Sequence, residues 1–427
     1  MTTTAGPALL QLLPDGDLFD PIGDPRHLMV RIQVPIYTGM KQRSAISAAL
    51  VIDRSGSMDG HKLESAKKAV LEAMQRLTDK DIAAVVTYDD DVQVLLPSGP
   101  MTADRRSKIS ESLGKIESGG NTNMISGWLT GCAQADVHRE GRLGRCLLLT
   151  DGLANVGISD PVIIARHAME LRERGMVTST FGVGDNFDES MLVGLAESGG
   201  GNFHDIASGK DISAAIEREL GEALEVAYAD VQLVLAPSPG MSLKPLSPWY
   251  ICAADSGALT LRLPDLIHGQ QLDIPFRVEM AAGLHKDANL SGHLVIAGVP
   301  MPKGQVTWHP APAEQVKKQD FDPEVIDAVA VALVAQGRRE ALAYKRAGDD
   351  GQARRQIRSA STSLSSLGRS SERITDLLHE LERDEQVYST PMTRRELKSR
   401  LAATVHESHG RKRDGQTQCF PRPSTAS

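Results

Sequence analysis

The sequence is poor in aromatic residues and has no excess of positive charge. Aromatic side chains make up 4% of the 427 residues, which is too few for a broad stacking surface that reads bases or sugars. Lys and Arg number 47 against 55 Asp and Glu, so the formal net charge is -8. Proteins whose main task is to bind nucleic acid usually carry a basic surface, so both features argue against that class.

Cysteines and long apolar runs are also scarce. The cysteines are few and form no CxxC pair: Cys132, Cys146, Cys252 and Cys419. Neither a disulfide framework nor a zinc knuckle is supported, and reduced thiols predict a cytoplasmic protein. The first twenty residues lack the basic segment and apolar run of an export signal. The most apolar stretch, residues 325–337, is short and contains Asp327, so no membrane span is predicted.

Between residues 46 and 226, short apolar runs alternate with segments of helical periodicity. This alternation is typical of a parallel α/β sheet, and near-continuous apolar strands are expected where helices cover both sheet faces. Leu63, Ala66 and Val70, for example, recur at the spacing of one helix face. We therefore expect a doubly wound, mostly parallel sheet. The predicted strands are 45–53, 82–88, 92–96, 145–151 and 176–184.

The segments on either side have different patterns. From 227 to 310 apolar and polar residues alternate between Pro, Gly and Ser turns, which predicts an antiparallel β-sandwich. Residues 27–36, within an N-terminal segment 1–45, alternate in the same way, so we expect the α/β domain to be inserted between strands of the sandwich. Residues 322–405 predict an α-helical region of three or four helices, and 406–427 a disordered tail.

Polar side chains gather where the predicted parallel strands end. The first strand ends in Asp53, and Ser55 and Ser57 follow it directly. The fourth strand ends in Asp151, and Thr122 lies in the glycine-rich loop 119–123 between them. Ligands of open α/β sheets bind at the carboxyl edge of the strands, so we expect these side chains to form one site.

This set of side chains suits a small hard cation. Mg²⁺ prefers oxygen ligands in octahedral geometry and keeps several waters. Ser55, Ser57 and Thr122 would supply hydroxyl ligands, while Asp53 and Asp151 would hold the ion directly or through water. One position would then stay open for an incoming carboxylate. The expected cofactor is Mg²⁺, with Mn²⁺ or Ca²⁺ as alternatives.

The same residues resemble a known motif. DxSxS at 53–57, the threonine of GGNTN at 119–123 and the aspartate of LLLTDG at 147–152 are similar to the metal-ion-dependent adhesion site of the von Willebrand factor type A family. The resemblance covers about 180 residues. It implies a six-stranded, mostly parallel sheet and binding of a partner protein through an acidic residue of that partner. The flanking sandwich resembles bacterial multi-domain members and inter-alpha-trypsin-inhibitor-like chains.

Motifs for other chemistry are incomplete. Residues 56–62 superficially resemble a phosphate-binding loop but lack the Ser or Thr after Lys62, and Gly182-Val183-Gly184 lacks the rest of a dinucleotide fingerprint. No HExxH or GxSxG motif occurs. The acidic run 89–91 is typical of a solvated hairpin turn. We therefore expect a non-enzymatic, cation-dependent protein-binding module or scaffold.

Two alternatives remain open. Some members of the family resemble adaptor subunits of AAA+ ATPases such as metal chelatases, so this chain could serve an ATPase. A Mg²⁺-dependent hydrolase is the alternative of a different class, with the ion activating water or polarising a phosphate. No suitable His or Glu is marked as a general base near the motifs, which disfavours hydrolysis.

Overall fold

The computed structural model describes residues 8–23, 25–36, 44–153, 156–247, 250, 252–255, 257–413 and 416–417. The chain divides into two compact units. One comprises residues 40–226, and the other combines residues 1–39 with 227–427. Within the described residues, no helix has both the length and the hydropathy needed to cross a membrane.

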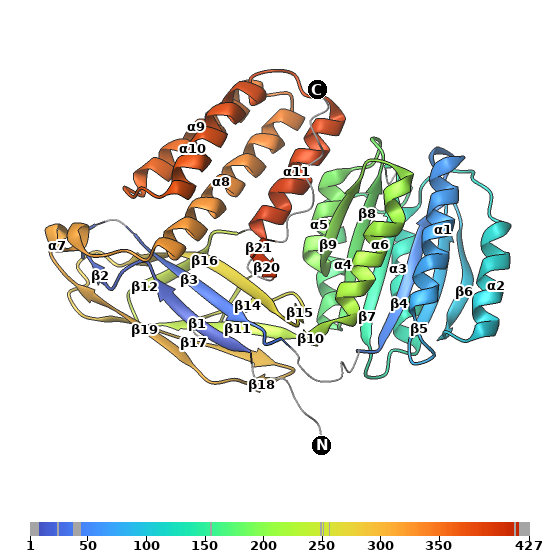
Figure 1. Ribbon diagram of the computed structural model, residues 1–427, viewed down its shortest axis with the longest axis horizontal. Helices are drawn as coiled ribbons and strands as arrows, with labels where there is room; N and C mark the ends of the chain where they lie inside the picture. Colours follow the sequence, from blue (N-terminus) through green and yellow to red (C-terminus); the bar gives the residue numbers. More distant parts are fainter. Residues whose placement is uncertain are drawn as a thin grey trace. The chain divides into compact units, whose positions relative to one another are not determined.

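The unit over 40–226 is built on a six-stranded sheet with the order β6-β5-β4-β7-β8-β9 (Figure 1). Neighbouring strands are parallel except for β5 and β6, which form the predicted antiparallel hairpin. The strands are β4 (Ile46–Asp53), β5 (Ile82–Tyr88), β6 (Val92–Pro100), β7 (Leu143–Thr150), β8 (Met176–Val183) and β9 (Gly200–Ile206). The predicted mostly parallel six-stranded sheet is therefore confirmed.

Helices cover both faces of this sheet. One face packs against α1 (His61–Arg76), α2 (Ala103–Gly114) and α6 (Ile212–Leu224). The remaining helices of the unit are α3 (Met124–Val137), α4 (Pro161–Glu173) and α5 (Glu189–Gly199). Helix α3 approaches the sheet closely, because a Cβ atom at Gly131 would lie 2.2 Å from a methyl carbon of Val51. Both faces of the central strand β4 are consequently buried along its length.

Helix α4 shows how local sequence fixes an element. The Asp160 carboxylate accepts a hydrogen bond from the backbone N–H of Val162, and Pro161 occupies the first turn, where its missing N–H costs nothing. Gly175, at a φ of 81°, follows the helix and turns the chain into β8.

The second unit contains two sheets that enclose a shared apolar core, and their strands pair antiparallel except for β2, which is parallel to β19. Strand β3 pairs with β16 from Gln33 opposite Gln271 to Arg26 opposite Val278, which confirms that the segment before the α/β unit joins the sandwich. The first sheet holds β1 (Leu9–Pro14), β3 (Arg26–Gln33), β12 (Met241–Pro245), β16 (Gln270–Met280), β20 (Arg411–Arg413) and β21 (Gln416–Thr417). The second holds β2 (Leu18–Phe19), β11 (Val231–Pro237), β13 (Cys252–Asp255), β14 (Ala258–Arg262), β17 (Ala288–Ile296), β18 (Val299–Pro300) and β19 (Gly304–Pro310). A separate two-stranded sheet consists of β10 (Val226–Tyr228) and β15 (Leu266–Ile267).

Helices follow the sandwich, as the sequence predicts. They are α7 (Ala313–Lys318), α8 (Pro323–Arg346), α9 (Asp350–Ser366), α10 (Glu372–Tyr388) and α11 (Arg394–Ser408). The half-buried Arg338 of α8 pairs with Glu380 and Asp384 of α10 and with Glu407 of α11, so these ion pairs connect three helices.

The C-terminal segment differs from the expectation of a disordered tail beginning at residue 406. Helix α11 continues to Ser408, and β20 pairs with β16. Lys412 of β20 forms an ion pair with the buried Asp273. This long-range contact, which the polar composition of the segment does not predict, helps to hold β20 against β16. Residues 418–427 of the predicted tail lie outside the described residues.

Candidate metal centre

The two aspartates of the predicted site lie at one edge of the α/β sheet. Strand β4 ends in Asp53, and Asp151 directly follows β7. The two strands are parallel neighbours with Ile52 opposite Leu149, so their carboxyl ends meet. Both aspartate side chains are buried. Two buried carboxylates on adjacent strands repel each other unless a cation or hydrogen-bond donors compensate them.

Asp53 is surrounded by donors from its own loop and from β7. Its Oδ1 accepts a hydrogen bond from the backbone N–H of Ser55 at 2.8 Å, and its Oδ2 accepts one from the Thr150 hydroxyl at 2.6 Å. Burial nevertheless raises the pKa of the Asp53 carboxyl to about 6, against the effect of these hydrogen bonds, and the charge of Asp151 adds to the rise. The site therefore holds a negative charge that its surroundings only partly stabilise.

Hydroxyl groups connect the two aspartates. The Ser57 hydroxyl donates to Asp151 Oδ1 at 2.6 Å, and the Oγ atoms of Ser55 and Ser57 lie 3.2 Å apart. The short 3-10 turn Gly56–Met58 sets this spacing, because the Met58 N–H donates to the carbonyl of Ser55 and the Met58 side chain is fully buried. The DxSxS spacing thus places both serines beside the aspartates.

The loop of Thr122 is joined to the same edge by backbone hydrogen bonds. The N–H of Gly56 donates to the carbonyl of Gly120, and the N–H of Gly119 donates to the carbonyl of Arg54. A Cβ atom at Gly152 would lie 3.3 Å from the Thr122 hydroxyl and 3.4 Å from the Ser57 hydroxyl. A side chain at Gly152 would crowd both hydroxyl groups, so a glycine suits this position. Thr122 and Ser57 are therefore close together, and all five predicted residues lie at the same sheet edge.

Two residues of this site were not assigned to it from the sequence. Thr150 donates to Asp53, and the Lys62 ammonium contacts Asp151 Oδ2 and the Ser57 carbonyl, the latter at 3.3 Å. Lys62 attracts attention in the sequence only as part of an incomplete phosphate-binding pattern. Its position one residue inside the helix that follows the DxSxS loop is the signal that points toward the site.

The acidic hairpin 89–91 lies against the Thr122 loop. Asp90 accepts hydrogen bonds from the backbone and side chain of Asn121, and Asp89 pairs with Arg54 at 3.0 Å. Two of the three acids therefore hold neighbouring loops in place. The sequence predicts only a solvated hairpin turn here, whereas in the structure Asp89 and Asp90 also bind side chains and backbone of the neighbouring loops.

The donor set fits a small hard divalent cation. It offers carboxylate and hydroxyl oxygens, which are the ligands that Mg²⁺ and similar ions take. Within the described part of the chain, no three His, Cys, Asp or Glu side chains form a cluster that could hold a metal. The hydroxyls are therefore essential to any ion bound at this edge.

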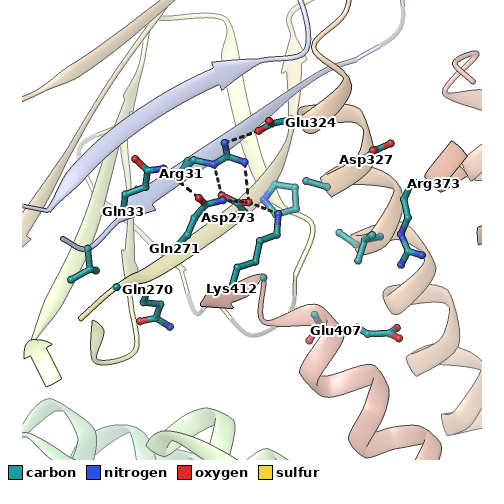
Figure 2. A pocket seen from close by; sticks show the side chains of 18 of the residues that line it. Arg31, Gln33, Gln270, Gln271, Asp273, Glu324, Asp327, Arg373, Glu407 and Lys412 are labelled. Carbon is teal, nitrogen blue, oxygen red and sulfur yellow. Dashed lines mark hydrogen bonds and ion pairs between the residues drawn. The ribbon is translucent and has the colours of Figure 1, made fainter. Parts of the chain in front are cut away.

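A cavity of about 810 Å³ in the other unit offers a contrasting polar site (Figure 2). It lies among β3, β16, α8 and the segment from α11 to β20. Figure 2 shows the Arg31 guanidinium between Asp273 and Glu324, with Lys412 reaching the same Asp273. Asp273 is buried, and both of its oxygens contact cationic side chains. The formal charges of these four paired side chains, two cations and two carboxylates, sum to zero.

Comparisons with known proteins agree with the fold and the motifs. Residues 49–218 match the family model of the von Willebrand factor type A domain. The uncharacterized protein YfbK of Escherichia coli is 31% identical over 198 residues, which are 46% of this chain and 34% of YfbK. The uncharacterized protein sll0103 of Synechocystis is 25% identical over 267 residues, covering 60% of this chain and 61% of that protein. This chain thus spans about a third and about three fifths of these two relatives.

A solved structure extends the likeness in fold to both units. A von Willebrand factor type A protein from Catenulispora acidiphila aligns with a TM-score of 0.70 and 18% identity, covering 91% of this chain and 90% of that one. At this identity the likeness concerns the fold alone. The matched sequence, the sheet order and the motif spacing together show that residues 49–218 form a von Willebrand factor type A domain, in a chain that resembles bacterial proteins carrying this domain.

Proposed function

We propose that this protein binds a divalent cation through Asp53, Ser55, Ser57, Thr122 and Asp151, and that the ion takes up an acidic side chain of a partner protein. The observation that carries the proposal is the convergence of two buried carboxylates and three hydroxyls at one sheet edge. Von Willebrand factor type A domains typically mediate protein–protein interaction, and the chain would act as a binding module or scaffold. Mg²⁺ is the proposed ion.

The residues have separate roles in this proposal. Ser55, Ser57 and Thr122 would offer hydroxyl oxygens as ligands. Asp53 and Asp151 would balance the charge and orient the hydroxyls, as the hydrogen bond from Ser57 to Asp151 already does. When bound, the cation supplies a positive point with an open position for an external carboxylate.

Exposed apolar side chains beside the site support a protein partner. After Asp151, the connection to α4 and the first turn of that helix carry four such side chains: Leu153, Ile158, Val162 and Ile163. Leu153 and Val162 are 57% and 67% exposed. Apolar groups next to a polar anchor are typical of protein interfaces, whereas a small soluble anion would gain nothing from them.

The arrangement favours binding over catalysis. Both oxygens of Asp53 accept hydrogen bonds, and both oxygens of Asp151 are engaged by Ser57 and Lys62. A hydrolase needs a base that is available to take a proton, and these carboxylates are committed. We therefore propose a non-enzymatic role, with service to an AAA+ ATPase as one form that such partner binding could take. The proposed location is the cytoplasm, consistent with the free thiols of Cys132 and Cys146.

The test is affinity capture with the full chain as bait, in Mg²⁺ and in EDTA, with quantification of proteins retained. We expect a partner that is retained in Mg²⁺, is released by EDTA and is lost with Ser57→Ala. Asp91→Asn is the matched control, because it removes an exposed carboxylate at the same edge without touching the proposed ligands. Equal retention by wild type and Ser57→Ala in both buffers would contradict the metal-bridged mechanism.

A further inference from the structure

Lys62 places a permanent positive charge inside the proposed cation site. Its ammonium group contacts the buried Asp151 carboxylate and the carbonyl of Ser57. The end of β8 lies close by, since a Cβ atom at Gly184 would be in van der Waals contact with the Lys62 Nζ atom, at 3.6 Å. The Lys62 side chain is 32% exposed, so solvent reaches it only in part. The ammonium group is therefore held by the DxSxS loop and by Asp151, which follows β7.

This position is unfavourable for a lysine on helical grounds alone. Lys62 lies in the first turn of α1, where the helix dipole presents positive partial charge and favours acidic side chains. The acid of this turn is Glu64. The contact with Asp151 offsets that penalty, so the location of Lys62 is explained by the site and not by the helix.

The charges of the site depend on Lys62. Asp53 and Asp151 contribute two negative charges and Lys62 one positive charge, which leaves a net charge of about -1. A divalent cation changes this to about +1, and one carboxylate from a partner then brings the site to neutrality. Without Lys62, the cation alone would neutralise the aspartates, and a partner carboxylate would arrive at a site with no excess positive charge.

We propose that Lys62 sets the balance between the two ligands of this site, weakening its hold on the cation and strengthening its hold on the partner's carboxylate. The inference rests on the proposed function, because it concerns the same ion and the same partner group. Lys62 acts through the field of its charge and through Asp151, so it is a positioning and specificity residue. The partner chemistry that follows is a single carboxylate, since a second would make the site negative again.

The experiment measures both affinities on the full chain. Mg²⁺ binding is followed by titration calorimetry, and acetate serves as the carboxylate probe for the Mg²⁺-saturated protein, followed by the amide NMR shifts of Thr122 and Gly152. For Lys62→Met we expect Mg²⁺ to bind about tenfold more tightly and acetate about tenfold more weakly, the scale expected for one partly exposed charge near the site. Lys62→Arg, which keeps the charge, should stay close to wild type.

The control is Lys68→Met, which removes the same charge from the solvent face of the same helix, where the side chain is 73% exposed. It should change neither affinity. If Lys62→Met weakens both ligands together, or alters neither, the balancing role is overturned and Lys62 is a structural residue. If wild type itself binds no Mg²⁺, the proposed function fails first, so the two failures are distinguishable.

Discussion

Two buried carboxylate clusters, one in each unit, differ in whether their charges cancel. In the sandwich unit, Asp273 receives Arg31 and Lys412, and burial, which alone would raise the pKa of its carboxyl, is outweighed by these contacts so that the pKa is lowered. In the α/β unit, Lys62 pairs with Asp151, while Asp53 accepts hydrogen bonds from neutral donors and burial raises the pKa of its carboxyl. The first cluster is stable as it stands. The second is left negative, which is the property expected of a site that binds a cation.

From this contrast we expect that removing the carboxylate of Asp273 lowers stability and leaves Mg²⁺ affinity unchanged, whereas removing the charge of Asp151 mainly lowers Mg²⁺ affinity. The largest effect on stability should come from Asp273→Ala, because it removes the counter-ion of Lys412 and the more buried of the two carboxylates that pair with Arg31. Removing one partner of a buried ion pair costs about 3–5 kcal/mol of unfolding free energy. Chemical denaturation would measure this loss, and Mg²⁺ affinity in the same variant should not change. A loss of Mg²⁺ binding in Asp273→Ala would contradict the proposal that the cation binds in the α/β unit alone.

Asp151→Asn should mainly lower the affinity for Mg²⁺ and change the stability of the metal-free protein little. We expect the affinity for Mg²⁺ to fall about 100-fold, roughly 2.7 kcal/mol, because one of two charges that balance the ion is removed. Stability in EDTA should fall much less than in Asp273→Ala, since the variant relieves repulsion between Asp151 and Asp53. Calorimetric titration and denaturation of the same protein sample measure both quantities. If Asp151→Asn binds Mg²⁺ with the wild-type affinity, Asp151 does not contribute to the cation site.

The α/β unit also contains a buried carboxylate, Glu219, whose charge is compensated. Glu219 of α6 accepts hydrogen bonds from Ser179 at 2.5 Å and from Asn202 at 3.0 Å, and it pairs with His204 at 2.8 Å. Burial would raise the pKa of the Glu219 carboxyl, but the hydrogen bond and charge of His204, with these other donors, lower it to about 2. This cluster is compensated like that of Asp273, so it should affect stability and leave metal binding unchanged.

The lowered pKa of Glu219 gives a pH dependence with a defined sign. The ionised carboxylate stabilises the fold fully above its unfolded pKa of about 4.3, and this contribution is lost as the pH falls toward about 2. Glu219→Gln should therefore cost about 2 kcal/mol at neutral pH, and the difference from wild type should shrink as the pH is lowered through this window. Denaturant unfolding at several pH values tests this. A difference that grows on acidification would contradict the assignment.

The smallest effect concerns the apolar rim. Val162→Ser should weaken retention of a Mg²⁺-dependent partner by several-fold, because about 1 kcal/mol is expected for one partly exposed aliphatic contact at an interface. Mg²⁺ affinity should stay at the wild-type value, since the side chain lies outside the ligand set. Val137→Ser is a suitable control, as Val137 is similarly exposed at the end of α3. Equal partner retention by Val162→Ser and wild type would show that Val162 does not contact the partner.

The difference between these clusters also explains what the sequence could predict. Strand β4, which ends in Asp53, and strand β7, which Asp151 follows, are near-continuous apolar runs, so their ends and the neighbouring polar motifs can be predicted from the sequence. The hydrogen bond from Thr150 to Asp53 could not be predicted from the sequence, because it depends on the register of two strands that are far apart in the chain. The contact of Lys62 with Asp151 depends likewise on where α1 begins relative to β7.

The same limit applies in the sandwich unit. Alternating apolar residues predict that the segment 27–36 joins the sandwich. The short polar strand Arg411–Arg413 has no such pattern, and its place is fixed by pairing with β16 and by the ion pair of Lys412 with Asp273. Elements held by apolar faces are visible in the sequence, whereas elements held by a long-range ion pair are not.

The central claim is that a cation binds where the charges do not cancel. A crystal structure of the protein grown with Mn²⁺, with anomalous diffraction recorded at an energy where manganese scatters, tests it most directly. The account predicts one strong anomalous peak in the α/β unit, within ligand distance of the hydroxyls of Ser55, Ser57 and Thr122. A peak instead beside Asp273 and Glu324, or no peak at the edge that carries Asp53 and Asp151, would contradict it.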